Sequence, residues 1–266
     1  MKSIFSEEQL EFIKLNYDKM TYVEIANLFG MTDKQVRNKA RKLGLSKLRK
    51  FDKRYFEIIN TNNKAYWLGF IYADGYLVNN NRSKELGIEL KFDDKYILEK
   101  FNEELGNVHK IIEKHQVKNF NNYTYETHSA LLRIYSKFIY EDLIDKNILP
   151  NKTNEKLFPT CNNEYFFDFL RGFLDGDGCI SLNSKKNLLT VHFTNSNPEF
   201  LDYLNEKIES HLGIKGSIYK ETDKKYKLYY FRKDDVKILL DKMYESSETK
   251  LIRKYEIYKS YYGYTS

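Results

Sequence analysis

Two aspartates carry the strongest chemical signal in this sequence, because each is the eighth residue of a repeated apolar nonapeptide. Asp74 lies near the end of WLGFIYADG (residues 67–75), and Asp177 takes the same place in LRGFLDGDG (residues 170–178). The two acids are 103 positions apart (177 − 74). Two carboxylates brought to one point repel each other unless a cation lies between them. Oxygen ligands of this kind suit Mg²⁺ and phosphate substrates, so the repeat predicts a metal site that acts on phosphates.

Each nonapeptide is expected to form a buried helix that packs against the other copy. A glycine is followed four residues later by a small residue in both copies, Gly69 by Ala73 and Gly172 by Gly176. Such residues share one helix face and allow two backbones to approach closely. The apolar stretch is about half of the roughly 20 residues that a membrane span needs, so no membrane segment is expected. The glycine after each acid is expected to be a left-handed C-cap.

These motifs resemble the LAGLIDADG homing endonucleases, and the resemblance covers the chain from about residue 60 to its end. It implies an α+β fold with two pseudo-symmetric halves, residues 60–160 and 161–266, each in the order α-β-β-α-β-β-α. The motif helices would form the interface, and two saddle-like antiparallel sheets would bind DNA. Periodicity fits this order, with expected strands at 76–78, 86–92, 108–117, 123–135, 180–182, 188–194, 214–220 and 226–231, and helices at 93–105, 137–145, 198–212, 233–244 and 248–258.

The resemblance also assigns the metal ligands. Asp74 and Asp177 would bind two or three divalent ions, joined by the main-chain carbonyls of Ala73 and Gly176. Asp175 stands at a position that is acidic in many family motifs, but the first copy has Tyr72 there. We therefore expect Asp175 to have a structural role at the helix interface.

Two lysines are candidates for the basic residues that the family places beside its metals. Lys152 lies in PNKT (residues 150–153), and Lys250 lies in ETKLIRKY (residues 248–255). Metals about 4 Å apart stabilise both ends of an in-line displacement at phosphorus, and a nearby lysine adds positive charge or orders the attacking water. The resemblance implies that each half cuts one strand of duplex DNA.

The amino-terminal 46 residues predict a separate helical module. Three capping boxes follow one another, with apolar residues in the hydrophobic-staple positions: Ser6 with Gln9, Thr21 with Glu24, and Thr32 with Gln35. Three short helices are therefore expected, and their arrangement resembles a helix-turn-helix whose third helix enters the major groove. On that helix Val36, Ala40 and Leu43 would face inward, and the outer face would carry the DNA contacts Lys34, Arg37, Asn38 and Arg41. The alternative is a small protein-binding bundle with solvated charges.

The net charge is concentrated at this end of the chain. Residues 1–54 hold 13 basic and 7 acidic residues, a net of +6, which equals the charge of the whole chain (44 − 38). A basic linker, residues 47–59, is expected to follow the DNA backbone through Lys47, Arg49, Lys50, Lys53 and Arg54. Further candidate DNA contacts lie near the expected strands, at Arg82, Lys91, Lys185 and Lys186.

These features together predict a site-specific, Mg²⁺-dependent double-strand DNA endonuclease. The target would be a long, partly asymmetric DNA site, and the enzyme would be a monomer because both repeats lie in one chain. It would be cytoplasmic and nucleoid-associated, of prokaryotic, phage or organellar origin, and free-standing or intron-encoded. Neither the two cysteines nor the five histidines show ligand spacing, which argues against a zinc or histidine-metal site. Two alternatives stay open on the same fold: a catalytically inactive DNA-binding transcription regulator, and an RNA maturase.

Overall fold

The computed structural model describes residues 5–17, 20, 22–45, 51–80, 83–120, 123–150, 158–245 and 247–263. The chain divides into two compact units, Met1–Phe51 and Asp52–Ser266, and each is described by itself. Nowhere in the described ranges is a helix long and apolar enough to cross a membrane.

The first unit contains three short helices, as the capping boxes predict: α1 (Glu7–Asn16), α2 (Tyr22–Phe29) and α3 (Asp33–Lys42). The boxes at Ser6 and Thr32 are formed in both directions, while Thr21 lies outside the described residues. Ile13, Ile25 and Val36, one from each helix, are fully buried in a single small core. The three-helix prediction is therefore confirmed.

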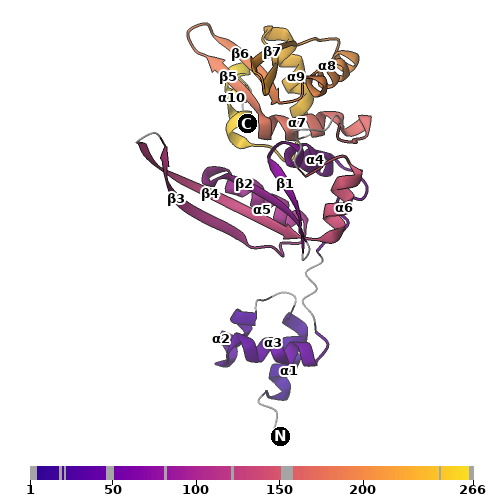
Figure 1. The fold of residues 1–266 in the computed structure, drawn as a ribbon. Coiled ribbons are helices and arrows are strands. Elements are labelled where there is room, and N and C mark those ends of the chain that lie inside the picture. Colours follow the sequence, from indigo (N-terminus) through magenta and orange to yellow (C-terminus); the bar gives the residue numbers. More distant parts are fainter. Residues whose placement is uncertain are drawn as a thin grey trace. The chain divides into compact units, whose positions relative to one another are not determined.

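The second unit contains two halves that repeat one order of elements (Figure 1). The first half comprises α4 (Asn62–Asp74), β1 (Gly75–Asn79), β2 (Lys84–Lys91), the 3₁₀ turn η1 (Phe92–Asp94), α5 (Lys95–Glu104), β3 (Ile111–Phe120), β4 (Tyr123–Tyr135) and α6 (Lys137–Asp145). The second half comprises η3 (Asn163–Tyr165), α7 (Phe166–Asp177), β5 (Gly178–Asn183), β6 (Leu188–Asn195), α8 (Pro198–Leu212), β7 (Ser217–Thr222), β8 (Lys225–Tyr230) and α9 (Lys233–Tyr244), and α10 (Ile252–Tyr262) follows. The predicted α+β class and the α-β-β-α-β-β-α order are confirmed.

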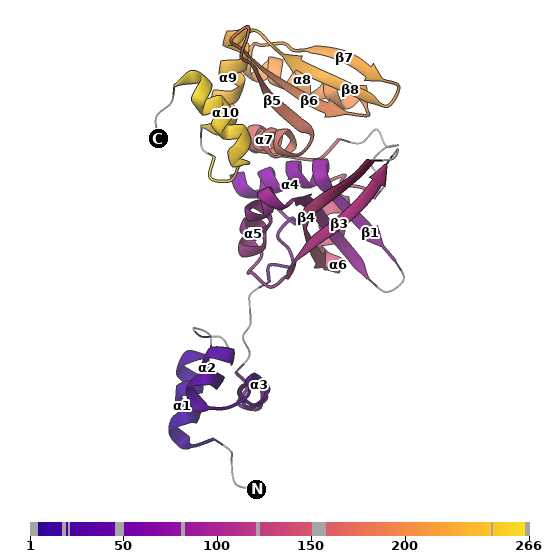
Figure 2. The same ribbon diagram turned by 90° about the vertical axis from the view of Figure 1, so that its left-hand side faces the viewer.

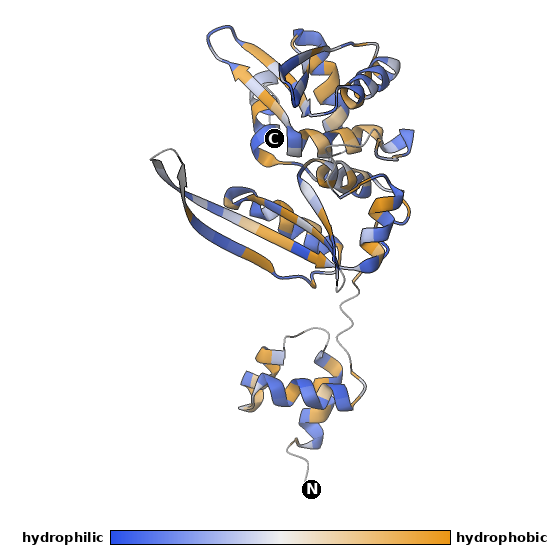
Figure 3. Cartoon of the chain, viewed as in Figure 1, coloured by the Kyte–Doolittle hydropathy of each residue, from blue (hydrophilic) through white to orange (hydrophobic). Residues whose placement is uncertain are grey.

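Each half builds one antiparallel four-stranded sheet, ordered β1-β2-β4-β3 and β5-β6-β8-β7. Helices α5 and α6 pack against the first sheet, and α8 and α9 pack against the second. Apolar and polar residues follow one another along the strands (Figure 3), and in β6 buried residues alternate with partly buried ones. Between the sheets lie α4 and α7, side by side in both views (Figures 1 and 2).

Residues 52–59 pack onto the second unit, although the sequence predicts them as part of the basic linker. Tyr55 and Phe56 are buried, and both rings contact Phe101 of α5. The Arg54 guanidinium pairs with the buried Asp142 carboxylate at 2.6 Å and lies 4.4 Å from the centroid of the Phe138 ring. The buried rings of Tyr55 and Phe56 therefore hold residues 52–59 against the first half.

The predicted left-handed caps are wrong, since Gly75 has φ −76° and Gly178 has φ −106°. Each motif helix instead runs directly into an extended strand. A methyl group on Gly75 would lie 2.7 Å from the carbonyl oxygen of Ile71, and one on Gly178 would lie 2.6 Å from that of Leu174. Glycine is required at both positions because a side chain would collide with the preceding helical turn. Backbone conformation does not require glycine there, since any residue can adopt these φ values.

Candidate functional site

The two motif helices meet backbone to backbone at the glycines that the sequence singled out. A methyl group on Gly69 of α4 would lie 2.0 Å from the carbonyl oxygen of Phe169 in α7. The equivalent group on Gly172 would lie 1.9 Å from the carbonyl oxygen of Tyr66. Ordinary contacts to a carbon atom are about 3.4 Å or more, so only glycine fits at either position. We call this contact the helix seam, comprising Gly69 and Ala73 of α4 with Gly172 and Gly176 of α7.

The seam brings the two acidic ends of the helices together. A methyl group on Gly176, the residue before Asp177, would lie 2.3 Å from the Ala73 Cβ and 3.3 Å from a carboxyl oxygen of Asp74. Asp177 is exposed and Asp74 is partly exposed. Asp177 also lines a pocket of about 240 Å³ that contains residues of both halves: Tyr72, Ala73, Asp177, Thr194, Asn195, Ser196, Lys224 and Lys225. The acids of both repeats therefore lie at one end of the seam.

The donor atoms at this end suit a hard divalent cation. The described ranges contain no group of three or more His, Cys, Asp or Glu side chains that could hold a metal ion, so an ion at this end of the seam would have two carboxylates, main-chain carbonyls and water as its ligands. Mg²⁺ is commonly held in that way, by one or two carboxylates together with water and substrate phosphate. Both acids also end a helix, where the negative end of the dipole adds to the attraction for a cation.

Lys254 is a residue at this site that the sequence interpretation missed. Its side chain is buried, and its ammonium donates to the carbonyl oxygens of Leu174, Asp175 and Gly178 at 2.6, 2.7 and 2.7 Å. Burial lowers the pKa of Lys254, whereas the carboxylates of Asp175 and Asp74 act in the opposite direction. The ammonium therefore caps the carboxyl end of α7 and is also attracted by the Asp74 carboxylate of the first half.

A signal for Lys254 exists in the sequence. Lys254 follows Asp177 by 77 positions (254 − 177), and Lys152 follows Asp74 by 78 (152 − 74). Lys250, the residue chosen from the motif, follows by 73. The pseudo-repeat of the two halves thus matches Lys152 with Lys254 more closely than with Lys250.

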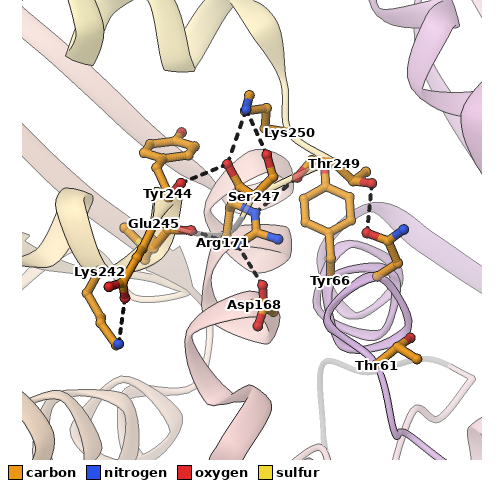
Figure 4. Close-up of polar contacts among 12 residues, drawn as sticks. Thr61, Tyr66, Asp168, Arg171, Lys242, Tyr244, Glu245, Ser247, Thr249 and Lys250 are labelled. Atoms are coloured by element: carbon orange, nitrogen blue, oxygen red, sulfur yellow. Dashed lines mark hydrogen bonds and ion pairs between the residues drawn. The ribbon is translucent and has the colours of Figure 1, made fainter. Parts of the chain in front are cut away.

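Of the two predicted catalytic lysines, the structure describes Lys250 and does not describe Lys152. The ammonium of Lys250 donates to the carbonyl oxygen and hydroxyl of Ser247 at 2.8 and 3.2 Å (Figure 4). It also lies 4.4 Å from the centroid of the Tyr255 ring. Burial lowers the pKa of Lys250. Lys152 lies outside the described residues. The catalytic assignment of both lysines stays a prediction.

Asp175 and Tyr72, which share one position in the two repeats, have unlike surroundings. Asp175 is buried at the seam, where one carboxyl oxygen accepts from the Tyr66 hydroxyl at 2.9 Å and from the Leu251 amide at 2.8 Å. Burial raises the pKa of Asp175 to about 6. Tyr72 packs against the Phe173 and Phe200 rings, and burial raises its pKa to about 12. These contacts agree with a structural role for Asp175.

The candidate DNA contacts that the structure describes are exposed. On α3 they form the face opposite the core, at Lys34, Arg37, Asn38 and Arg41, and Arg37 also pairs with Asp33 at 2.9 Å. Lys53 precedes the first half, Lys91 ends β2, and Lys185 and Lys186 occupy the turn between β5 and β6; all are exposed. Arg54 is also exposed, but its guanidinium pairs with the buried Asp142 carboxylate at 2.6 Å. The other four candidates, Lys47, Arg49, Lys50 and Arg82, lie outside the described residues.

Comparison with known proteins finds a family match in the second half and the same fold in solved structures. Residues 164–255 match the family described as LAGLIDADG-like domain. An uncharacterized protein of Methanocaldococcus jannaschii is 31% identical over 174 residues, which cover 62% of this chain and 60% of that relative. The chain thus matches about three fifths of the length of this curated relative.

Two solved structures of the meganuclease I-SmaMI, bound to uncleavable DNA with different central four bases, share the fold. One has a TM-score of 0.51 at 16% identity and covers 74% of this chain and 88% of its own. The other has a TM-score of 0.50 at 15% identity and covers 75% of this chain and 87% of its own. At this level of identity the similarity establishes the fold, and the site must be argued from the residues of this chain.

Proposed function

We propose that this chain, whose residues 164–255 match the LAGLIDADG-like domain family, is a site-specific endonuclease that hydrolyses both strands of duplex DNA with divalent metal ions. The observation that carries this proposal is the helix seam, which brings Asp74 and Asp177, one from each half, to the same end of two closely packed helices. A fold without this activity has no need to gather like charges at two helix C-termini, where they are disfavoured.

In the proposed reaction, Asp74 and Asp177 would hold the divalent ions together with the carbonyls of Ala73 and Gly176. Bound metals would polarise the phosphodiester and stabilise the attacking and leaving oxygens, and Mg²⁺ best suits this all-oxygen ligand set. The Lys254 ammonium neutralises the carboxyl end of α7, the helix whose last residue is Asp177. Lys224 and Lys225, which line the pocket with Asp177, would contact the phosphates next to the cleaved bond.

Each half would cut one strand, because each repeat supplies one acid. The two sheets differ in residue composition, so the two parts of the DNA target would differ in sequence. A single chain contains both halves and both acids, so a monomer is sufficient for the reaction.

The first unit would add a second contact with the same DNA. Its third helix presents Lys34, Arg37, Asn38 and Arg41 on one exposed face, which supports a helix-turn-helix role in the major groove. A helix in the major groove requires duplex DNA, since the deep and narrow groove of duplex RNA does not admit it. This feature favours the endonuclease over an RNA maturase.

The experiment that tests the proposal is DNA cleavage by three versions of the full chain, using target sites selected from randomised DNA. The wild type should cut both strands with Mg²⁺ and bind without cutting with Ca²⁺. Asp74→Asn and Asp177→Asn should each bind the target with nearly unchanged affinity while double-strand cleavage fails. Glu256→Gln, which removes an exposed carboxylate on α10, is the control and should cut normally.

Two outcomes would contradict the proposal. Tight binding with no cutting in any metal would favour the transcription regulator. Normal double-strand cleavage by either aspartate variant would show that the acid in question is not a metal ligand.

A further inference from the structure

Residues 247–254, which we call the crossing segment, link α9 to α10 and contact both halves of the second unit. From the first half, the Lys100 ammonium donates to the carbonyl oxygen of Glu248 at 2.6 Å, and the Tyr96 hydroxyl accepts from the Ile252 amide at 2.6 Å. In addition, the Thr249 hydroxyl donates to the Asn63 side chain of α4 at 3.1 Å, and Arg253 pairs with Asp94 at 3.0 Å. The crossing segment is therefore bound to α4, η1 and α5.

From the second half, the segment is held by two buried charges of α7. Arg171 is 1% exposed, and its guanidinium donates to the carbonyl oxygens of Thr249 at 3.0 Å and Met243 at 2.6 Å (Figure 4). Asp168, one turn earlier on α7, pairs with the same guanidinium at 2.8 Å. Asp175 is also 1% exposed and accepts from the Leu251 amide. The segment is thus fixed through its main chain, which holds it in one register.

The contacts between α7 and α10 are reciprocal. The Asp175 carboxylate accepts from Leu251, the N-cap residue of α10, which has no side-chain cap of its own. One turn into α10, the Lys254 ammonium donates to the carbonyl oxygens at the end of α7, including that of Asp175. A negative charge thus lies at the amino end of α10 and a positive charge at the carboxyl end of α7, and both arrangements favour the helix dipoles.

We propose that Asp175 is a positioning residue for the cleavage reaction, which fixes the start of α10 and thereby places the Lys254 ammonium at the metal-binding end of the helix seam. Tyr66 of α4 donates to the same carboxyl oxygen, so Asp175 joins both motif helices and the crossing segment at one buried point. The inference rests on the proposed endonuclease function. It gives Asp175 the role of positioning Lys254, whereas Asp74 and Asp177 would bind the metal ions.

The test combines two substitutions in the full chain, Asp175→Ala and Lys254→Met, separately and together. Single-turnover cleavage at saturating target DNA reports the reaction, and DNA binding with Ca²⁺ reports affinity. Each single variant should cleave about 10–100-fold more slowly, the usual loss when a partner that orients a metal site is removed. If Asp175 acts through Lys254, the double variant should be no slower than the slower single variant, because the two losses are coupled.

Asp175→Asn separates positioning from charge, because the amide keeps one oxygen that can accept from Leu251 and Tyr66. It should recover a large part of the rate lost in Asp175→Ala. Hydrogen exchange gives a readout that does not depend on cleavage: the amides of residues 248–254 should exchange faster in Asp175→Ala, while those of α8 keep their wild-type rates. If Asp175→Ala proves too unstable to measure, Lys100→Met, a change at the surface, replaces it. This variant should also raise exchange in the crossing segment.

Wild-type cleavage and exchange rates in Asp175→Ala would overturn the inference, and so would fully multiplicative losses in the double variant. If the wild type binds DNA but cuts none, the endonuclease proposal fails, and the exchange experiment still decides whether Asp175 fixes the start of α10. Slow cleavage with unchanged exchange in Asp175→Ala would also overturn the inference, since it would show that Asp175 does not act through the crossing segment.

Discussion

Gly172→Ala is the substitution whose effect follows most directly from the geometry of the helix seam. The added methyl group would lie 1.9 Å from the Tyr66 carbonyl oxygen, against an ordinary contact of at least 3.4 Å. The backbones of α4 and α7 must therefore separate by up to 1.5 Å (3.4 − 1.9). Both partners at this contact are main-chain atoms, so no side-chain rotation can relieve the overlap.

The energetic balance of this change is unfavourable. Overpacking in a core costs about 1–3 kcal/mol, and the upper value applies where backbone meets backbone. Alanine is better than glycine in a helix interior by about 1 kcal/mol. The net loss is about 2 kcal/mol, which lowers the melting temperature of a domain of this size by about 4–8 °C. Cleavage should fall further, since a displacement of about 1 Å at a reacting centre can cost about 100-fold.

The assays are thermal unfolding and single-turnover cleavage, with Gly69→Ala and Gly263→Ala as comparisons. Gly69→Ala should behave like Gly172→Ala, because its methyl group would lie 2.0 Å from the Phe169 carbonyl oxygen. Gly263 has φ +69° and no atom within 4 Å of an added methyl group, so alanine there costs about 1–2 kcal/mol through backbone conformation alone and should spare cleavage. A Gly172→Ala protein as stable and as active as the wild type would refute the close approach of the helices.

Two further predictions concern salt and pH. Replacing Lys34 and Arg41 of α3 together by alanine should reduce the slope of log affinity for DNA against log salt by about 2, one for each lost phosphate contact, and an unchanged slope would show that this face does not touch DNA. Burial, assisted by the Lys227 ammonium, lowers the pKa of His192 from 6.5 to about 4. The unfolded chain therefore binds a proton that the folded protein does not, so the free energy of unfolding should fall as the pH drops from 6.5 towards 4. Chemical unfolding of His192→Gln should show a shallower loss in that window, and an equal loss would exclude His192 as its source.

Features that depend on neighbouring residues in the sequence could be predicted, because their partners are fixed by spacing. The capping boxes at Ser6 and Thr32 are local hydrogen bonds, and both are formed. The repeated small residues also defined the seam correctly, since a helix puts positions i and i+4 on one face. The order of strands followed from the alternation of apolar residues and from the family resemblance.

Features that depend on distant partners were missed or misplaced. A helix was predicted from residue 248, but α10 begins at Ile252, because main-chain bonds to Lys100, Arg171 and Asp175 hold the preceding residues outside the helix. Lys254 was overlooked for a related reason: its partners are main-chain carbonyls, which no residue type marks, so only its spacing from Asp177 pointed to it. The cap prediction failed because a glycine after a helix indicates either a left-handed turn or a close approach, and only the structure separates these.

The seam is less symmetric than the repeat that forms it, and the asymmetry has a physical origin. At the position two residues before the metal-binding acid, the first copy has an aromatic ring and the second a carboxylate. Tyr72 fills space between α4 and α8, where apolar contacts with Phe173 and Phe200 are available. Asp175 faces the crossing segment, where Tyr66 and Leu251 supply donors that a buried carboxylate needs and that an aromatic ring would leave unpaired. Exchanging the two residues should therefore be worse than either single change. A ring at position 175 would strand buried donors, and a carboxylate at position 72 would lose the ring contacts and add a second negative charge near Asp177.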